Sequence, residues 1–96
     1  MYKMYVLVRR DLSTSQQAVQ AGHAVAKLVQ RGLPHSWNGT LVYLGVNDED
    51  RLDDWKQKLA TRDIEHIEFR EPDIGDELTA IATVDPGKVF SKLKLL

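Results

Sequence analysis

Residues 3–15 read KMYVLVRRDLSTS, a strand of the buried type that runs directly into the start of a helix. Residues 3–9 are almost continuously apolar and rich in β-branched and aromatic side chains, which predicts a central strand covered on both faces. Residues 11–15 have the composition of a turn, and each of their three hydroxyl side chains could cap the following helix. Such a strand-to-helix junction is a usual place for a binding site in a small α/β domain.

The helix predicted over residues 16–31 has an apolar side and a polar side. The apolar stripe recurs at helical spacing: Ala18, Gly22, Val25 and Val29. The polar side carries five residues at i, i+3, i+4 spacing: Gln16, Gln20, His23, Lys27 and Gln30. This side is either a solvated face or, at Gln20 and His23, a place where an amide and an imidazole orient a partner group or relay a proton.

The rest of the chain alternates between strands and helices. The predicted elements are a strand over 41–46, a helix over 48–61 that Asn47 caps, strands over 64–70 and 78–84, and a helical turn over 88–93. Trp55 is the predicted anchor of the second helix. The order β-α-β-α-β-β-α predicts an α/β fold with a right-handed parallel crossover between the first two strands. We expect a single domain over residues 1–96.

The composition excludes several classes of protein. The 96 residues include no cysteine, which removes disulfides, thiolate metal sites and cysteine nucleophiles. No apolar run approaches the ~20 residues of a membrane span, and the N-terminal run is too short for a signal peptide, so we expect a soluble cytoplasmic protein. Because the net charge is −1, any contact with nucleic acid must depend on a local cluster of lysine and arginine.

Three further groups of residues are candidates for function. Arg9, Arg10 and Asp11 end the first strand and form either a local ion pair or a contact to phosphate or carboxylate. The acidic loop 71–77 offers oxygen ligands with a glycine at the bend, but its spacing matches no metal motif, so we predict no metal site. Thr79 and Thr83 lie on a strand of period two and should point to the same face.

These motifs together resemble the type 2 peptidyl-tRNA hydrolases. The resemblance rests on Arg9-Arg10-Asp11-Leu12 after the opening strand, on Ala18-Val19-Gln20-Ala21-Gly22-His23-Ala24 in the helix, and on the Leu-Lys-Leu-Leu that ends the chain. It implies a three-layer α/β/α sandwich with a mixed four-stranded sheet of order 2-1-4-3, in which one strand is antiparallel to the rest. It also implies cleavage of the ester between a peptide and its tRNA, without a metal or an organic cofactor.

The resemblance also implies roles for individual residues. Asp73 would act as the base or orient the water, with Glu71 as the competing choice, and Thr79 would donate a hydrogen bond. Gln20 and His23 would shape the site. Contacts to the substrate, peptidyl-tRNA, are expected from five residues: Arg9, Arg10, Asp11, Gln16 and Lys27.

The chain departs from the family between the Asp-Leu pair and the helix. Family members carry a lysine- and glycine-rich segment there, whereas residues 13–17 read STSQQ. The alternative to a hydrolase is therefore a non-catalytic binding module of the same fold, which binds RNA, a protein or a second copy of itself as a homodimer. Hydrolysis of a different small ester or amide is a third interpretation. Convergence of Gln20, His23, Asp73 and Thr79 on one cleft would favour the hydrolase.

Overall fold

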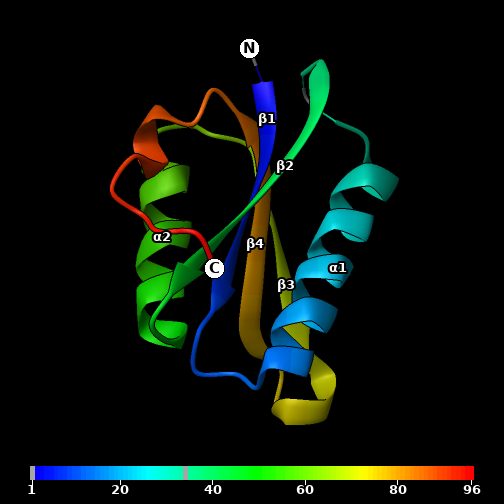
Figure 1. Cartoon of the computed structure of the whole chain (residues 1–96), viewed down its shortest axis with the longest axis vertical. Coiled ribbons are helices and arrows are strands. Elements are labelled where there is room, and N and C mark those ends of the chain that lie inside the picture. The colour runs from blue at the N-terminus through cyan, green and yellow to red at the C-terminus, as the bar shows by residue number, and fades with distance from the viewer. Residues whose placement is uncertain (1, 34) are drawn as a thin grey trace.

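A computed structural model gives the structure of the chain and describes residues 2–33 and 35–96. Its elements are β1 (Tyr2–Arg9), α1 (Thr14–Arg31), β2 (Trp37–Val46), α2 (Glu49–Thr61), β3 (Ile67–Glu71), the 3₁₀ turn η1 (Pro72–Ile74), β4 (Glu77–Asp85) and the 3₁₀ turn η2 (Lys88–Phe90). The sheet stands between α1 and α2, which cover its opposite faces (Figure 1). This three-layer α/β/α arrangement confirms the predicted fold class.

The four strands form one mixed sheet in the order β2-β1-β4-β3. β1 pairs in parallel with β2, whereas β4 runs antiparallel to both of its neighbours, β1 and β3. The predicted order and the single antiparallel strand are therefore confirmed. β1 is central, and its apolar run is buried on both sides because successive side chains point to opposite faces of the sheet.

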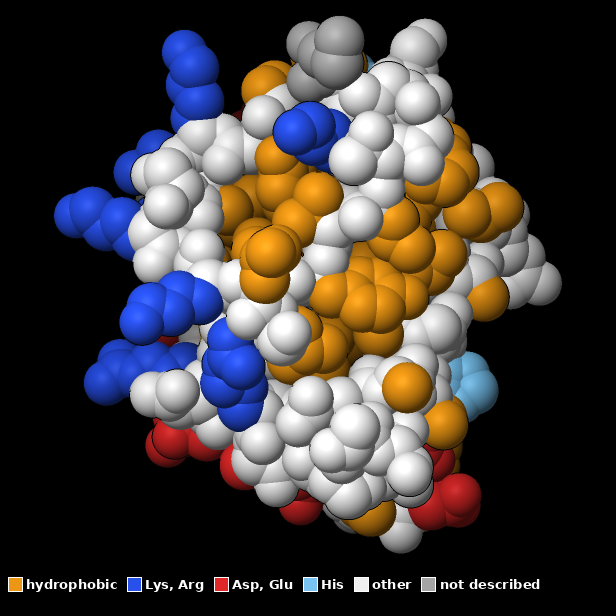
Figure 2. All heavy atoms as spheres, viewed as in Figure 1, with side chains coloured by type: hydrophobic (Ala, Val, Ile, Leu, Met, Phe, Trp, Pro, Cys, Tyr) orange, Lys and Arg blue, Asp and Glu red, His pale blue; other side chains and the backbone are white. Residues whose placement is uncertain are grey.

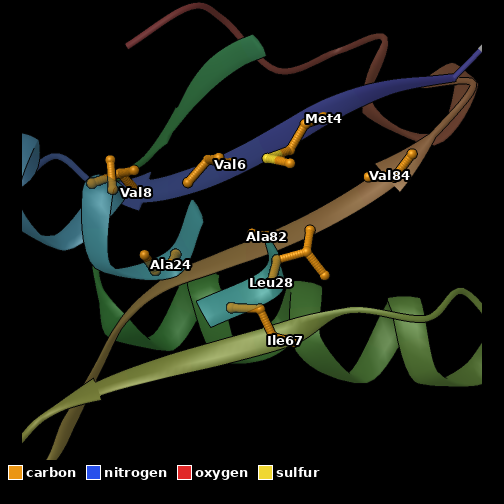
Figure 3. Close-up of a cluster of buried hydrophobic side chains, with 10 residues drawn as sticks. Met4, Val6, Val8, Ala24, Leu28, Ile67, Ala82 and Val84 are labelled. Carbon is orange, nitrogen blue, oxygen red and sulfur yellow. The ribbon is translucent and has the colours of Figure 1, made fainter. Parts of the chain in front are cut away.

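Each face of the sheet carries its own apolar core. On the α1 side, Met4, Val6 and Val8 of β1 meet Ala24 and Leu28 of the helix, and Figure 3 shows them with residues of β3 and β4. On the α2 side, the core includes Leu7 of β1 with Leu52 and Leu59 of α2. Trp55 lies at the margin of this second core and is only half-buried, with its ring centroid 5.4 Å from that of Phe90.

The face of α1 that packs against the sheet differs from the predicted apolar stripe. The buried residues of the helix are Gln20, Ala21, Ala24 and Leu28. Val29, from the predicted stripe, is 51% exposed. The prediction was wrong because Gln20 was assigned to the polar side. The helix instead buries this amide, and the cost of burial is offset by hydrogen bonds.

Some boundaries also differ from the prediction, for local reasons. The N-cap of α2 is Asp48 rather than Asn47, since the Asp48 carboxylate accepts a backbone N–H of the first turn at 2.9 Å. β2 begins at Trp37, inside the expected loop, and its first residues pair irregularly around Gly39, whose φ is 89°. The helical turn predicted over 88–93 is shorter in the structure, the 3₁₀ turn η2, and Leu95 then forms an isolated antiparallel bridge with Leu44. Neither helix in the described part of the chain has the length and apolar character to cross a membrane.

Candidate active site

A row of hydrogen-bonded polar side chains joins α1, β3 and β4 on the α1 side of the sheet. The hydroxyl of Thr79 donates to Gln20 Oε1 at 2.8 Å. Gln20 Nε2 donates to Glu71 Oε2 at 3.0 Å and to Gln16 Oε1 at 3.1 Å. The row therefore begins at a fully buried threonine and ends at a carboxylate that reaches solvent.

Gln20 is the centre of this row and is held in one orientation. Its side chain is 1% exposed, and burial of an amide without partners would be costly. Both hydrogens of its Nε2 are donated, and its oxygen accepts from Thr79. The amide therefore has little freedom to rotate, and it presents its nitrogen to Glu71.

A β-bulge places Thr79 beside Gln20. β3 pairs Phe69 with Ala80 and Arg70 with Leu78, so Thr79 has no partner on that strand. An extra residue of this kind interrupts the alternation by which successive side chains of a strand point to opposite faces of the sheet. Thr79 consequently meets α1, whereas Thr83 lies opposite Tyr5, on the α2 side of the sheet. The prediction that Thr79 and Thr83 share a face was therefore wrong.

Glu71 ends β3, and its carboxylate is stabilised in the ionised form. The hydrogen bond from Gln20 is the largest cause that lowers the pKa of Glu71 below its usual value, followed by the backbone N–H of Asp73, which donates to Oε1 at 3.3 Å. The positive charge of a protonated His23 lowers this pKa further. Glu71, the competing choice from the sequence, is the carboxylate that contacts Gln20.

Asp73 lies two residues further on, in η1, and its side chain is exposed. Its contact with the row of polar side chains is made by its backbone N–H, to Glu71. The catalytic role that the resemblance implies for Asp73 stays a prediction. Among the residues expected to converge, the structure brings Gln20 and Thr79 into direct contact.

His23 and Lys27 extend the polar side of α1 along β3. The imidazole of His23 stacks on the ring of Phe69, with the centroids 4.7 Å apart and the planes 16° from parallel. Lys27 Nζ donates to the carbonyl of Glu68 at 2.9 Å. His23 remains exposed in this position, close to Glu71, while Lys27 lies one turn further along the helix.

Arg9, Arg10 and Asp11 make their contacts outside the row of polar side chains around Gln20. Arg9 is buried and binds both carboxylate oxygens of Asp11 at 2.9 Å and Glu77 Oε1 at 2.7 Å. The hydrogen bond to Asp11 is the largest cause that raises the pKa of Arg9, and the same bond lowers the pKa of Asp11. Arg10 donates to the carbonyl of Leu95 at 2.6 Å. These contacts fit the local ion pair that the sequence offered as an alternative, and the predicted contacts to substrate stay predictions.

Two features of the site, the burial of Gln20 and the bulge at Thr79, were not predicted. A signal for the first is present in the sequence, since Ala21, Ala24 and Leu28 form an i, i+3, i+7 stripe that Gln20 adjoins. No comparable signal marks the bulge. In the part of the chain that the structure describes, no three residues of the metal-ligating types come together at one place.

Comparison with known proteins places this chain in a family. A solved structure described as a protein of unknown function, Atu0240 from Agrobacterium tumefaciens strain C58, has the same fold, with a TM-score of 0.73. The sequence identity is 15%, and the match covers 99% of this chain and 97% of the other. Comparison with curated proteins gives no significant match. The sequence matches the family described as peptidyl-tRNA hydrolase PTH2 over residues 2–96, nearly its full length. The chain therefore belongs to the peptidyl-tRNA hydrolase PTH2 family.

Proposed function

We propose that this protein hydrolyses the ester between a peptide and its tRNA, with Glu71 and His23 at the reacting groups and Gln20 and Thr79 holding them in place. The observation that carries the proposal is the hydrogen-bonded row from Thr79 through Gln20 to Glu71. A fully satisfied polar row that ends at a solvent-facing carboxylate is a rigid support for a water molecule. Membership of the PTH2 family supports the choice of substrate.

Glu71 orients the attacking water in this proposal. Each of its oxygens accepts one hydrogen bond from the protein and keeps a further lone pair for the water. Because its pKa is lowered, Glu71 is a weak base, and it acts mainly by holding the water. Gln20 and Thr79 are positioning residues, since both are buried and act on substrate through the exposed side chains that Gln20 holds.

The imidazole of His23 moves the proton. As the water oxygen bonds to the ester carbon, the imidazole accepts the water proton, and the carbonyl oxygen becomes an oxyanion. When the tetrahedral intermediate collapses, the bond from carbon to the tRNA oxygen breaks, and the imidazolium returns the proton to that oxygen. Stacking on Phe69 holds the ring in place for both transfers.

Gln16 is the donor that we assign to the oxyanion. Its Oε1 accepts from Gln20, which fixes the orientation of its amide. Its Nε2 donates to no group among the described residues, and the residue is exposed in the first turn of α1. A donor at this place stabilises charge that develops on the carbonyl oxygen.

The test is single-turnover cleavage of a labelled acetyl-aminoacyl-tRNA at high enzyme concentration, against a reaction without enzyme. Glu71→Gln should lower the rate by about 10²-fold or more, the usual effect of a positioned acid–base or orienting group. Asp73→Asn is the matched control, because it removes the same charge two residues away. The reverse result would assign the catalytic carboxylate to Asp73. A cleavage rate with the wild-type protein that is indistinguishable from the rate without enzyme would overturn the hydrolase proposal.

A non-catalytic binding module is the second candidate. It is favoured by residues 13–17, where the lysine- and glycine-rich segment of the family is replaced by STSQQ. Exposed apolar side chains on α1 and β2, including Val29 at 51% and Leu41 at 43%, are consistent with self-association as a homodimer. This candidate would be supported by a dimer mass at sedimentation equilibrium, together with absent cleavage and retained binding of tRNA.

A further inference from the structure

A groove between α2 and the C-terminal segment carries positive charge that the proposed site does not use. Its volume is about 370 Å³. It is lined by Trp55 and Lys58 of α2, by Arg62, which caps the C-terminal end of that helix, and by Lys88 and Lys92 of the C-terminal segment (residues 86–96). Figure 2 shows Lys and Arg side chains following one another down the side of the molecule that α2 occupies in Figure 1, with acidic side chains gathered at the lower end. No acidic residue lines the groove.

The sequence concentrates this charge although the chain as a whole is slightly acidic. Residues 86–96 contain three lysines and no aspartate or glutamate, whereas the net charge of the chain is −1. Lys58, in the last turn of α2, and Arg62, the C-cap of that helix, both line the groove. Two separate segments therefore contribute cations to one concave surface.

The cations of the groove are not neutralised by ion pairs. The ion pairs within the described residues involve Arg9, Arg31, Arg51, Lys56 and Arg70. Lys58 instead lies over the ring of Trp55, 4.5 Å from its centroid, and this contact leaves its charge in place. The side chains of Arg62, Lys88 and Lys92 are exposed. Four cations thus remain available to one ligand.

We propose that this groove binds the phosphate backbone of RNA. A groove lined by several uncompensated cations is suited to a polyanion with regularly spaced charges. A larger hollow of about 600 Å³ is lined by Arg31 and also by Asp63 and Glu65, and its mixed charge does not suit a polyanion. RNA is favoured over a lipid surface because none of the exposed large apolar side chains lines the groove, and membrane-binding surfaces combine basic with apolar contacts.

The groove and the proposed active site lie on opposite sides of the sheet. The longest dimension of the molecule is 34 Å. An A-form RNA stem of a dozen base pairs is about as long as the molecule, so one RNA can contact the groove and reach round the end of the sheet towards the site. The inference rests on the proposed function in one respect only, the choice of tRNA as the RNA.

The experiment measures binding of fluorescently labelled, uncharged tRNA to the full chain at several salt concentrations. Lys88→Gln combined with Lys92→Gln should raise Kd about tenfold at ~50 mM salt and make the slope of log affinity against log salt shallower by roughly 1.5–2. The control combines Arg31→Gln with Lys56→Gln, which also removes two cations but takes them from ion pairs with Glu65 and Glu68. We expect the control to change Kd by less than about twofold.

Equal losses in both variants would overturn the proposal, because the effect would then be one of net charge. An unchanged Kd in the groove variant would also overturn it. The proposal would also be overturned if the groove variant lost binding to vesicles of anionic lipid while it still bound RNA. That result would assign the groove to a membrane surface. The two proposals fail separately. If the groove variant binds tRNA more weakly but the parent protein does not cleave peptidyl-tRNA, only the hydrolase proposal is refuted. If the parent cleaves and the groove variant binds tRNA normally, only the proposal of RNA binding in the groove is refuted.

Discussion

Replacing Thr79 with valine tests whether the buried row of hydrogen bonds has the arrangement described above. Valine has almost the same shape as threonine, so Thr79→Val removes the hydroxyl and leaves the packing largely unchanged. Gln20 Oε1 then loses its donor in a place where the side chain is only 1% exposed. An unsatisfied buried acceptor costs about 1–3 kcal/mol. At roughly 4–8 °C per kcal/mol for a domain of this size, the Tm should fall by at least ~4 °C.

Gln20→Leu should be less harmful to stability, although it removes the centre of the row. The hydroxyl of Thr79 still has an acceptor, because the carbonyl of Phe69 lies 3.2 Å from Oγ1. Glu71 reaches solvent and can be hydrated. Once Gln20 is leucine, adding Thr79→Val removes a hydroxyl that no longer has a buried amide to satisfy. The double variant should therefore be nearly as stable as Gln20→Leu alone.

The assay is urea unfolding of the parent, the two single variants and the double variant. The cycle should give a coupling free energy of about 1–3 kcal/mol between Thr79 and Gln20. All three variants should cleave peptidyl-tRNA more slowly, because Glu71 loses Gln20 in two of them and Gln20 loses the hydroxyl that fixes its amide in Thr79→Val. A Thr79→Val variant that unfolds at the same urea concentration as the parent, with additive effects in the cycle, would refute the buried row.

Three further predictions concern pH, packing and backbone strain. The free energy of unfolding of the parent, relative to Glu71→Gln, should be constant above pH ~5. It should decrease as the pH falls through the lowered pKa of Glu71. Urea midpoints of both proteins measured across the acid range would detect this change. Trp55→Ala should cost about 1–3 kcal/mol in thermal unfolding rather than the 3–5 of a fully buried ring, because the ring is half-buried; a larger loss would contradict the observed exposure. Gly87→Ala should lower Tm by several degrees, since φ is 96° and an added Cβ would meet the Tyr5 hydroxyl; an unchanged Tm would argue against this turn.

Sequence patterns predicted the central strand of the sheet, because they report which strands are covered on both faces, whereas the strand order came from the resemblance to the type 2 peptidyl-tRNA hydrolases. The apolar run of β1 identified the central strand, and the order of elements predicted the parallel crossover between β1 and β2. The same reasoning failed on α1, where two stripes compete. Counting Gln20 as polar selected the stripe through Val25 and Val29, whereas the helix buries the stripe through Ala21, Ala24 and Leu28.

An analysis of hydrophobic periodicity counts every amide side chain as exposed, and it therefore cannot predict that one is buried. The burial of Gln20 depends on acceptors and donors supplied by segments more than 50 residues away, Glu71 and Thr79. No local pattern around residue 20 contains that information. A polar residue next to a stripe of small apolar residues is still a useful warning, because small residues let the helix approach the sheet closely enough for such contacts.

The bulge at Thr79 is what connects the fold to the site. Since side chains alternate along a strand, Thr79 would share a face with Ile81 in a regular strand, and Ile81 packs in the core beneath α2. The extra residue lets Leu78 and Ile81 both pack on that side, although they are three positions apart, and turns the Thr79 hydroxyl towards α1. Without the bulge, Gln20 would have no donor for its buried oxygen, and Glu71 would lose the fixed amide that stabilises its ionised form. The position of one unpaired residue in β4 therefore decides on which face of the sheet the proposed active site can form.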